Sequence, residues 1–270
     1  MCEAVEVPLT DPERTLERIA AFETHFAKAQ SSTVIDLPFG YALLHNDFPL
    51  THSHNRVVVD SSVADSRASA AEVIAGTDDV LATAGVAHRY VSIDGLCDEL
   101  TSALIADGYE HDIIATMVYG GAGLGPPRHP VAAVSLETRR PALVRDWRAD
   151  IPDATDELLR QLADRTSLYE LGAEVELLAV YEGDEIAARA DLYLDRAGRV
   201  AQFESLVTHA DYRGRGYGRA LLASAIERAQ AAAADLIFLT ADLGDWPYHW
   251  YERAGFVEVT HVHHFSKAIA

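Results

Sequence analysis

The sequence predicts an α/β protein in which a mixed central sheet is flanked by helices. Short apolar stretches typical of strands alternate with longer amphipathic stretches typical of helices over most of the 270 residues. A stretch rich in glycine and proline at 120–130 separates two halves of ordinary domain size. The two halves repeat part of one order of helices and strands, which suggests an internal duplication.

The first half, residues 1–120, opens with an amphipathic helix, continues with two short strands and closes with two helix–strand pairs. The expected helices are Asp11–Gln30, Ser69–Thr83 and Leu96–Ala106, and the expected strands are Tyr41–His45, Arg56–Asp60, Arg89–Ile93 and His111–Tyr119. Residues 121–130 are expected to form an interdomain linker, because glycine frees the backbone there and proline ends regular elements.

The second half, residues 131–270, opens with the apolar run Val131–Leu136 and two helices, Pro141–Asp150 and Thr155–Leu171, the second capped by Thr155. A hairpin and a strand–helix–strand crossover follow, which predicts a mixed sheet. The expected strands are Glu176–Tyr181, Glu185–Leu194, Ala201–Thr208, Leu236–Ala241 and Val257–Phe265, and the expected helices are Gly216–Ala233 and Pro247–Ala254.

The duplication is clearest at the ends of the two halves. Leu104–Glu110 and Tyr251–Val257 each read as a helix end, a glycine at the C′ position, an aromatic residue and a strand. Unrelated α/β proteins also contain this pattern, so the alternative is that the two halves are unrelated domains.

The charge of the chain favours some partners and disfavours others. Its 42 acidic residues against 22 basic ones give a formal charge of −20, which repels nucleic acid and anionic membranes and attracts amines. Solubility alone can also favour such a surface. No apolar run of about 18 residues and no basic leader are present, so we expect a cytoplasmic protein. From the charge we expect no nucleic-acid or membrane partner. We expect a monomer or a homodimer.

Cysteines and histidines do not predict a disulfide framework or a metal site. Cys2 and Cys97 are expected to be reduced thiols. Histidines gather near 45–54 and 261–263, but carboxylate or cysteine partners at ligand spacing are missing, so we expect no metal. His52, His54 and Asn55 alternatively line a groove facing the active half.

The loop Arg213-Gly214-Arg215-Gly216-Tyr217-Gly218 lies between a predicted strand and a predicted helix. Its glycines allow positive φ and direct successive N–H groups into one concavity at the positive end of the helix dipole. This geometry suits a pyrophosphate, with the arginines adding donors. A dinucleotide site would place such a loop after the first strand, and a Walker loop needs Gly-Lys-Ser/Thr, so neither alternative fits.

At this point the sequence resembles the GNAT superfamily of acetyl-CoA-dependent N-acetyltransferases. Glu204–Leu222 looks like the cofactor motif of that family, whose core is Arg/Gln-x-x-Gly-x-Gly/Ala, and Trp250–Phe256 resembles its second motif, Tyr-x-x-x-Gly-Phe. The resemblance covers about residues 131–267. It implies tandem GNAT-like acyl-CoA N-acyltransferase domains: a degenerate domain at 1–120 and a catalytic domain at 131–270.

The sequence departs from the family pattern at several places. Thr208-His209-Ala210 stands where the family commonly has Val-x-Pro, and Gly244 stands where it often has Asn. The first half has no Arg-x-x-Gly-x-Gly, and Ser61–Arg67 stands in its place. We therefore infer that the first half has lost the cofactor site.

The resemblance also implies roles for individual residues. Glu204 is the candidate general base that deprotonates the amine, with a structural glutamate as the alternative. Tyr251 is the candidate acid that protonates the leaving thiolate, with a core tyrosine as the alternative. Acetyl-CoA is the expected cosubstrate, held by the backbone of the strand end and by the loop. The implied cofactor-binding residues are Leu206, Val207, Thr208, Arg213, Gly214, Arg215, Gly216, Tyr217, Gly218 and Arg219.

The expected activity is direct transfer of an acetyl group from acetyl-CoA to a primary amine of a small molecule or peptide, because neither cysteine lies near a motif. The alternatives are a non-catalytic acyl-CoA sensor or scaffold, and an acetyltransferase acting on a protein or aminoacyl-tRNA; the acidic surface disfavours tRNA. The acids that could receive the amine are Glu170, Asp242 and Asp245, and Trp246, Tyr248, His249 and Trp250 could line the pocket. A surface or core role is the alternative for each of them.

Overall fold

The computed structural model describes residues 11–60, 68–95, 98–121 and 124–269. The two cysteines and the stretch Ser61–Arg67 lie outside the described residues. The chain forms two compact units. Unit 1 comprises Met1–Thr24, Ala115–Arg139 and Ala173–Thr260, and unit 2 comprises His25–Ile114, Arg140–Gly172 and His261–Ala270.

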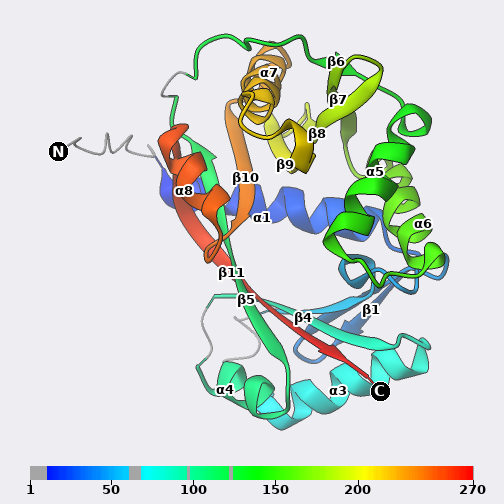
Figure 1. Cartoon of the computed structure of the whole chain (residues 1–270). Helices are drawn as coiled ribbons and strands as arrows, with labels where there is room; N and C mark the ends of the chain where they lie inside the picture. Colours follow the sequence, from blue (N-terminus) through cyan, green and yellow to red (C-terminus); the bar gives the residue numbers. More distant parts are fainter. Residues whose placement is uncertain (1–10, 61–67, 96–97, 122–123, 270) are drawn as a thin grey trace. The chain divides into compact units, whose positions relative to one another are not determined.

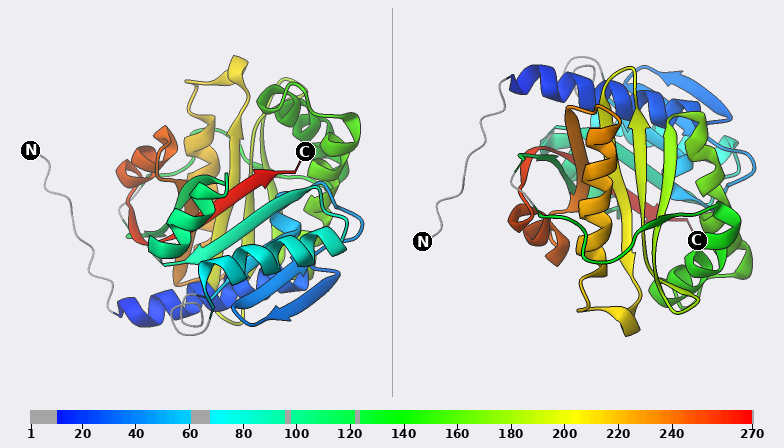
Figure 2. Two further views of the ribbon diagram at one scale, coloured as in Figure 1. Left: turned by 90° about the horizontal axis from the view of Figure 1, so that it is seen from below. Right: turned by 90° about the horizontal axis from the view of Figure 1, so that it is seen from above.

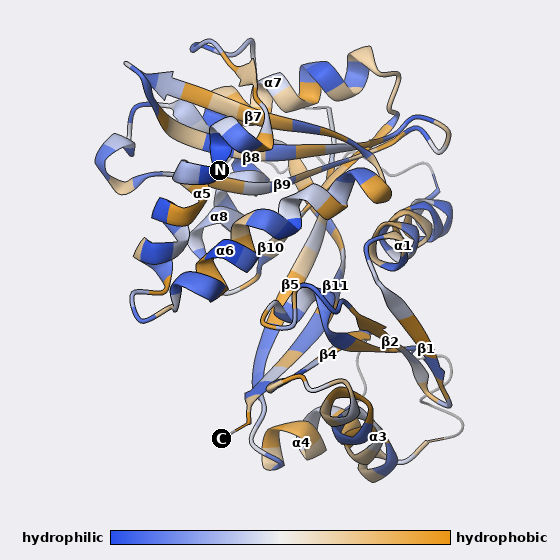
Figure 3. Cartoon of the chain, turned by 90° about the vertical axis from the view of Figure 1, so that its right-hand side faces the viewer, coloured by the Kyte–Doolittle hydropathy of each residue, from blue (hydrophilic) through white to orange (hydrophobic). Residues whose placement is uncertain are grey.

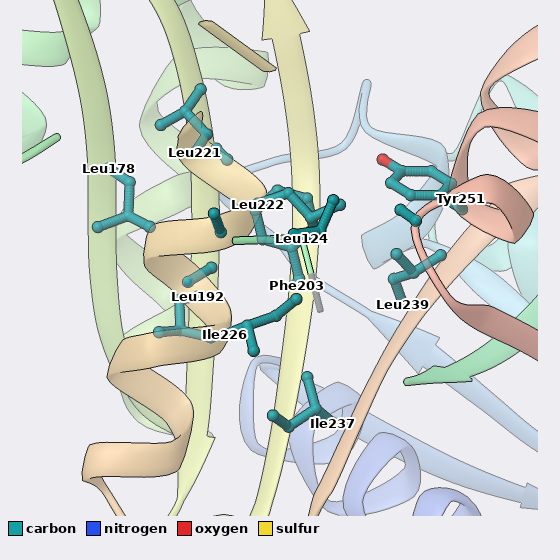
Figure 4. Packing of buried hydrophobic residues seen from close by; sticks show 14 of the residues in the cluster. Leu124, Leu178, Leu192, Phe203, Leu221, Leu222, Ile226, Ile237, Leu239 and Tyr251 are labelled. Carbon is teal, nitrogen blue, oxygen red and sulfur yellow. The ribbon is translucent and has the colours of Figure 1, made fainter. Parts of the chain in front are cut away.

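Unit 1 is built on a sheet whose strand order is β11-β5-β10-β9-β8-β7-β6. The pairs β6–β7, β7–β8 and β8–β9 are antiparallel, whereas β9 and β10 are parallel. Helix α7 lies against this sheet (Figure 1), and Leu221, Leu222 and Ile226 pack with Leu192 and Phe203 of the strands (Figure 4). The strands are β6 (Ala132–Ala133), β7 (Glu174–Glu182), β8 (Glu185–Asp195), β9 (Val200–Thr208) and β10 (Leu236–Asp242), and the helices are η3 (Ala210–Tyr212), α7 (Tyr217–Ala231) and α8 (Trp246–Arg253).

Unit 2 has the strand order β1-β2-β3-β4-β11-β5. Helices α3 and α4 place apolar residues between polar ones (Figure 3), and their apolar residues share a core with Val57, Val91 and Phe265 of the sheet. Its strands are β1 (Thr33–Leu37), β2 (Gly40–Leu44), β3 (Arg56–Val59) and β4 (His88–Asp94), and its helices are η1 (His52–His54), α3 (Ala70–Thr83), α4 (Asp98–Ala106), α6 (Asp156–Asp164) and η2 (Arg165–Leu171).

Four elements contribute residues to both units. They are α1 (Pro12–Ala29), β5 (Glu110–Tyr119), α5 (Leu136–Asp150) and β11 (Phe256–Ala268). In unit 1, Arg18 of α1 forms an ion pair with Asp235 at 2.5 Å, and the ring of Phe22 packs edge-on against Phe238 at 5.7 Å. In unit 2, the backbone N–H of Leu50 donates to the side chain of Gln161 on α6 at 3.0 Å. Each half of the sequence therefore supplies helices and a strand to the other unit.

The two units repeat one topology. The strand order of unit 2 is β1-β2-β3-β4-β11-β5, and that of unit 1, read from β7, is β7-β8-β9-β10-β5-β11. In both orders four strands that follow one another in the chain come first, and β5 and β11 come last in exchanged positions. Strand β6 has no counterpart in unit 2. In the described part of each connection, α3 lies between the parallel strands β3 and β4, and α7 lies between β9 and β10. Gly108 (φ 90°) and Gly255 (φ 92°) both adopt the left-handed conformation, and buried Tyr109 and Phe256 follow them. The fold thus has the tandem, mixed α/β architecture that the sequence predicts.

Almost every predicted element is present, with bounds that differ by a few residues. The hydroxyl of Thr155 accepts from the backbone N–H of Leu158 at 3.1 Å, so the predicted cap of α6 is confirmed. Strand β1 was not predicted, because Thr33–Leu37 contains Asp36 and is mostly exposed, which hides the alternation of a buried strand. The segment Thr155–Leu171 forms α6 and then the 3₁₀ helix η2.

The glycine- and proline-rich segment belongs to unit 1. Its described residues cross α7 (green segment in the right view of Figure 2), with Leu124 in the hydrophobic core. The guanidinium of Arg219 donates to the carbonyl of Leu124, and that of Arg228 donates to the carbonyl of Val131 at 3.3 Å. The compact units thus group residues differently from the expected division at 121–130. A degenerate domain at 1–120 and a catalytic one at 131–270 stay predictions about ancestry and activity.

Replacing Leu124 with alanine tests whether this segment is part of the core. The side chain is only 8% exposed, so Leu124→Ala is expected to lower the free energy of unfolding by about 2–3 kcal/mol, measured by chemical denaturation. Leu171→Ala is the control, because Leu171 is 61% exposed and its loss is expected to cost less than about 0.5 kcal/mol. Equal stabilities of the two variants would show that the segment is a loose connection.

Candidate functional site

Strands β9 and β10 of unit 1 begin side by side and then stop pairing. Their register runs from Val200 opposite Leu236 to Phe203 opposite Leu239, although β9 continues to Thr208. On its other edge β9 still pairs with β8 up to Thr208 opposite Ala188. No strand among the described residues pairs with 204–208 on the β10 side. The backbone there can accept an added extended ligand as a strand would.

A bulge accompanies this divergence. Arg189 lies opposite Val207 and Asp191 opposite Glu204, so β9 has two residues, Ser205 and Leu206, where β8 has one. Ser205 adopts a left-handed conformation (φ 56°), which is uncommon for a residue with a Cβ atom. A bulge bends a strand and redirects the following groups. It therefore turns the end of β9, where the predicted cofactor-binding residues Leu206, Val207 and Thr208 lie.

Glu204 occupies the point where the strands separate. Its Oε1 atom accepts hydrogen bonds from the backbone N–H of Thr240 at 3.2 Å, from the hydroxyl of Thr240 at 2.6 Å and from the side chain of Gln202 at 3.0 Å. The carboxylate thus satisfies an N–H group of β10 that has lost its strand partner. Burial raises the pKa of the Glu204 carboxyl, and these hydrogen bonds oppose the rise.

A buried ion pair joins Arg139 of α5 to Asp191 of β8, the residue opposite Glu204. Each partner is about 1% exposed. The hydroxyl of Tyr193 donates to the Oδ2 atom of Asp191 at 2.9 Å, and the guanidinium of Arg139 donates to the carbonyl of Ala190 at 3.1 Å. The negative charge of Asp191 contributes to the raised pKa of Glu204. This pair links the first helix of the second half to the strand beside the site.

The glycine loop follows β9 and leads into α7. Gly214 (φ 77°) and Gly216 (φ 85°) are both left-handed, as expected for a loop that presents N–H groups. Gly216 is the N-cap of α7 and provides no side-chain cap for the N–H groups of the first turn. Unsatisfied N–H groups at the positive end of a 15-residue helix attract an anion. The residues present therefore fit a pyrophosphate.

The side chains of the loop make contacts within unit 1. Arg213 donates to the carbonyl of Thr208 at 3.2 Å, and Arg215 donates to the carbonyl of Asp211 at 3.2 Å while both arginines remain exposed. The hydroxyl of Tyr217 donates to the carboxylate of Glu182, which raises the pKa of the Tyr217 phenol. Tyr217 can therefore contribute to an anion site through its backbone rather than its side chain.

His129 also reaches this loop. Its Nε2 atom lies 3.0 Å from the carbonyl oxygen of Arg215, and its ring packs edge-on against Tyr217 with a centroid distance of 4.8 Å. Its neighbour Arg128 is exposed. No sequence pattern predicts this contact, because 86 residues separate His129 from Arg215.

Tyr251 is placed by helix α8 and is 7% exposed. Its ring packs in the core of unit 1 beside Leu239, and its hydroxyl points away from α8 (Figure 4). Burial, and then the negative charge of Glu204, raise the pKa of the phenol. A raised pKa keeps the hydroxyl protonated at neutral pH, as a proton donor requires. Both predicted catalytic residues thus lie in one unit and interact electrostatically.

The candidate acceptor-binding residues are spread out. Asp245 caps α8 through a 2.7 Å bond from the backbone N–H of Trp246, whose side chain is 68% exposed. The hydroxyl of Tyr248 donates to Glu258 at 2.7 Å, which raises the pKa of that tyrosine to about 12. Asp242, His249 and Trp250 also lie in unit 1, whereas Glu170 lies in unit 2. These contacts assign structural partners to several members of the set.

The histidine clusters contain no recognisable metal centre. Among the described residues, no group of three or more His, Cys, Asp and Glu side chains could hold a metal ion. His54 is buried, and its Nε2 atom lies 3.1 Å from the side-chain oxygen of Gln30. His263 lies 2.8 Å from His111, ring nitrogen to ring nitrogen. In the same described part of the chain, no helix is long and apolar enough to cross a membrane.

Comparison with known proteins shows that part of the second half is similar to a known family. The acetyltransferase (GNAT) family model matches residues 140–256. No curated protein matches the sequence.

Solved structures show that the whole fold is shared. A functionally unknown conserved protein from Staphylococcus epidermidis superposes with a TM-score of 0.71 at 13% identity, covering 89% of this chain and 95% of that one. A GCN5-related N-acetyltransferase from Kribbella flavida gives 0.59 at 18% identity, covering 93% and 94%. A tandem GNAT protein from the clavulanic acid biosynthesis pathway gives 0.54 at 12% identity, covering 79% and 74%. At these identities the similarity establishes the fold.

Proposed function

We infer, from the GNAT acetyltransferase domain that residues 140–256 form, that the chain transfers an acetyl group from acetyl-CoA directly to a primary amine of a small molecule or peptide. The observation that carries this proposal is the divergence of β9 from β10 immediately before an uncapped helix N-terminus. An extended thioester arm can pair with 204–208, and its pyrophosphate can reach the first turn of α7. Acetyl-CoA supplies an activated acetyl thioester.

Backbone groups hold and polarise the donor in this proposal. The residues that would bind it through N–H and C=O groups are Leu206, Val207 and Thr208 on β9, followed by the loop from Arg213 to Arg219. An N–H group at the β9 bulge can donate to the thioester oxygen, which gains negative charge as the amine attacks. Arg213 and Arg215 are exposed and can exchange their present carbonyl partners for phosphate oxygens.

Glu204 and Tyr251 divide the proton transfers. An amine is protonated at neutral pH, and Glu204 accepts its proton directly or through one water. Tyr251 donates its phenolic proton to the sulfur as the C–S bond breaks. The nitrogen of the tetrahedral intermediate loses its extra proton, which restores the Tyr251 phenol, and the products are an amide and free coenzyme A. The raised pKa of Tyr251 keeps its phenol protonated at neutral pH, as its role requires, and Glu204 acts in this proposal in its ionised form.

Acceptor-dependent release of the coenzyme A thiol, measured over a panel of amines, tests the proposed activity directly. Turnover with one or more amines is expected. Tight binding of acetyl-CoA without turnover on any amine would support the sensor instead.

The loop is tested by Gly216→Val, because a β-branched residue at φ 85° is strained and disturbs the first turn of α7. We expect the Kd for coenzyme A, measured by calorimetry, to rise at least about tenfold. Gly108→Val is the matched control, since Gly108 has a similar φ of 90° but lies at the end of α4 in unit 2. Equal affinity in both variants would place the pyrophosphate elsewhere.

Glu204→Gln tests the base while keeping an oxygen that can accept the bonds from Thr240. We expect kcat/KM to fall about 10²–10⁴-fold. In the wild type, kcat/KM should decrease as the pH falls through the raised pKa of Glu204, because the base becomes protonated, and this limb should disappear in the variant. Glu252→Gln, on the exposed side of α8, should retain both rate and limb. A Glu204→Gln profile that matches the wild type would exclude the role.

Tyr251→Phe tests the acid, since it removes only the hydroxyl. The expected result is a kcat reduced about 10²-fold or more with an unchanged Kd for acetyl-CoA. Tyr109→Phe serves as the control, because Tyr109 is also a buried tyrosine but belongs to the core of unit 2. If both variants turn over at the wild-type rate, Tyr251 is a core tyrosine only.

A further inference from the structure

The sheet of unit 2 has one apolar and one polar face. Val57, Val91 and Phe265 point into the core under α3 and α4. Side chains alternate along a strand, so Arg56, Tyr90, Ser92 and His264 belong to the opposite face. Ser92 is paired with His264 across β4 and β11 and with Val58 across β4 and β3. Polar groups from three adjacent strands therefore meet there.

Direct contacts join this face to η1 and η2. The hydroxyl of Tyr90 lies 2.7 Å from the Nδ1 atom of His264. The ring of His52 packs at a centroid distance of 4.0 Å against His88 and 5.8 Å against Tyr90. Arg165 of η2 donates from Nη1 to the hydroxyl of Ser53 at 2.8 Å, and Ser53 adjoins His52 in the chain. These groups form a continuous polar cluster within unit 2.

Three buried polar atoms in this cluster have no hydrogen-bond partner among the described residues: the Oγ atom of Ser92 and the Nε atoms of Arg56 and Arg165. Ser92 is only 5% exposed. A buried donor without a partner costs about 1–3 kcal/mol, and more when it is charged. All three atoms can donate, so each can be satisfied by an oxygen acceptor.

The positive charges of Arg56 and Arg165 affect the pKa of the same neighbours. Burial, and then the charges of Arg165 and Arg56, lower the pKa of His54 to about 3. Both arginines also oppose the rise that burial causes in the pKa of Tyr90. Asp94 lies on the same face, where burial raises the pKa of its carboxyl and the positive charge of Arg56 opposes that rise. Two cations thus act on one small region of a chain whose formal charge is −20.

We propose that Arg56, Ser92 and Arg165 form a binding site for a carboxylate, with the rings of His52, His88 and Tyr90 packing against a planar group attached to it. The guanidinium fork matches the two oxygens of a carboxylate. A single negative charge suits the site better than the double charge of phosphate, because Asp94 and Asp112 lie nearby. This site goes beyond the proposed transfer reaction and does not depend on it.

Benzoate is a suitable probe, since it joins a carboxylate to a planar ring. Calorimetric titration of the full chain, without acyl-CoA, is expected to show benzoate binding at least about tenfold more tightly than benzyl alcohol or inorganic phosphate. Absence of benzoate binding would overturn the proposal, and tighter binding of phosphate would overturn its choice of ligand. Because no acetyl donor is present, the result does not depend on whether the chain is an acetyltransferase.

Variants locate the binding. Arg56→Gln and Arg165→Gln are each expected to raise the Kd for benzoate at least about tenfold, while Arg160→Gln, on the exposed side of α6, leaves it unchanged. Ser92→Ala removes a single oxygen and should weaken binding severalfold; it tests the site even where an arginine variant does not fold. Wild-type affinity in Ser92→Ala and in every arginine variant that folds would show that benzoate binds elsewhere.

Discussion

The separation of β9 from β10 is the constraint on which the candidate site depends. A parallel pair that stays in register satisfies its own N–H and C=O groups and offers nothing to a ligand. Here the pairing ends at Phe203, and the side chain of Glu204 accepts a hydrogen bond from the backbone N–H group of Thr240. The same carboxylate that stabilises the opening is therefore placed at its apex. A structural and a chemical role for Glu204 are compatible, because its hydrogen bonds engage one oxygen, Oε1.

Burial changes the pKa of the ionisable groups around this opening. Tyr251 and Glu204 are both withdrawn from solvent, and the same withdrawal raises the pKa of each. For the phenol this preserves a proton, and for the carboxyl it strengthens a base. The ion pair of Arg139 and Asp191 brings a further negative charge close to Glu204 without leaving either partner uncompensated. A small number of buried charges thus sets the electrostatics of the site.

Both halves of the sequence take part in each of the two repeated units. Each half supplies elements to the other unit, so neither half of the sequence corresponds to a complete compact unit. The glycine loop of unit 1 adds no strand to the sheet, so the order of the strands does not depend on it. Because a fold does not dictate the ligand of each of its units, the polar face of β3 and β4 can bind a different ligand.

The sequence by itself determined the mixed α/β class, most elements, the glycine loop and the two motifs, because these depend on local periodicity and on residues close together in the chain. The bulge at Ser205, the bonds from Thr240 to Glu204, the Arg139–Asp191 pair and the contact of His129 with the loop were decided by the tertiary structure. Each depends on residues that lie apart in the sequence, and no local sequence pattern identifies which residues come together. The exchange of elements between the halves was hidden for the same reason: a sequence shows where a helix begins, whereas packing decides which core it covers.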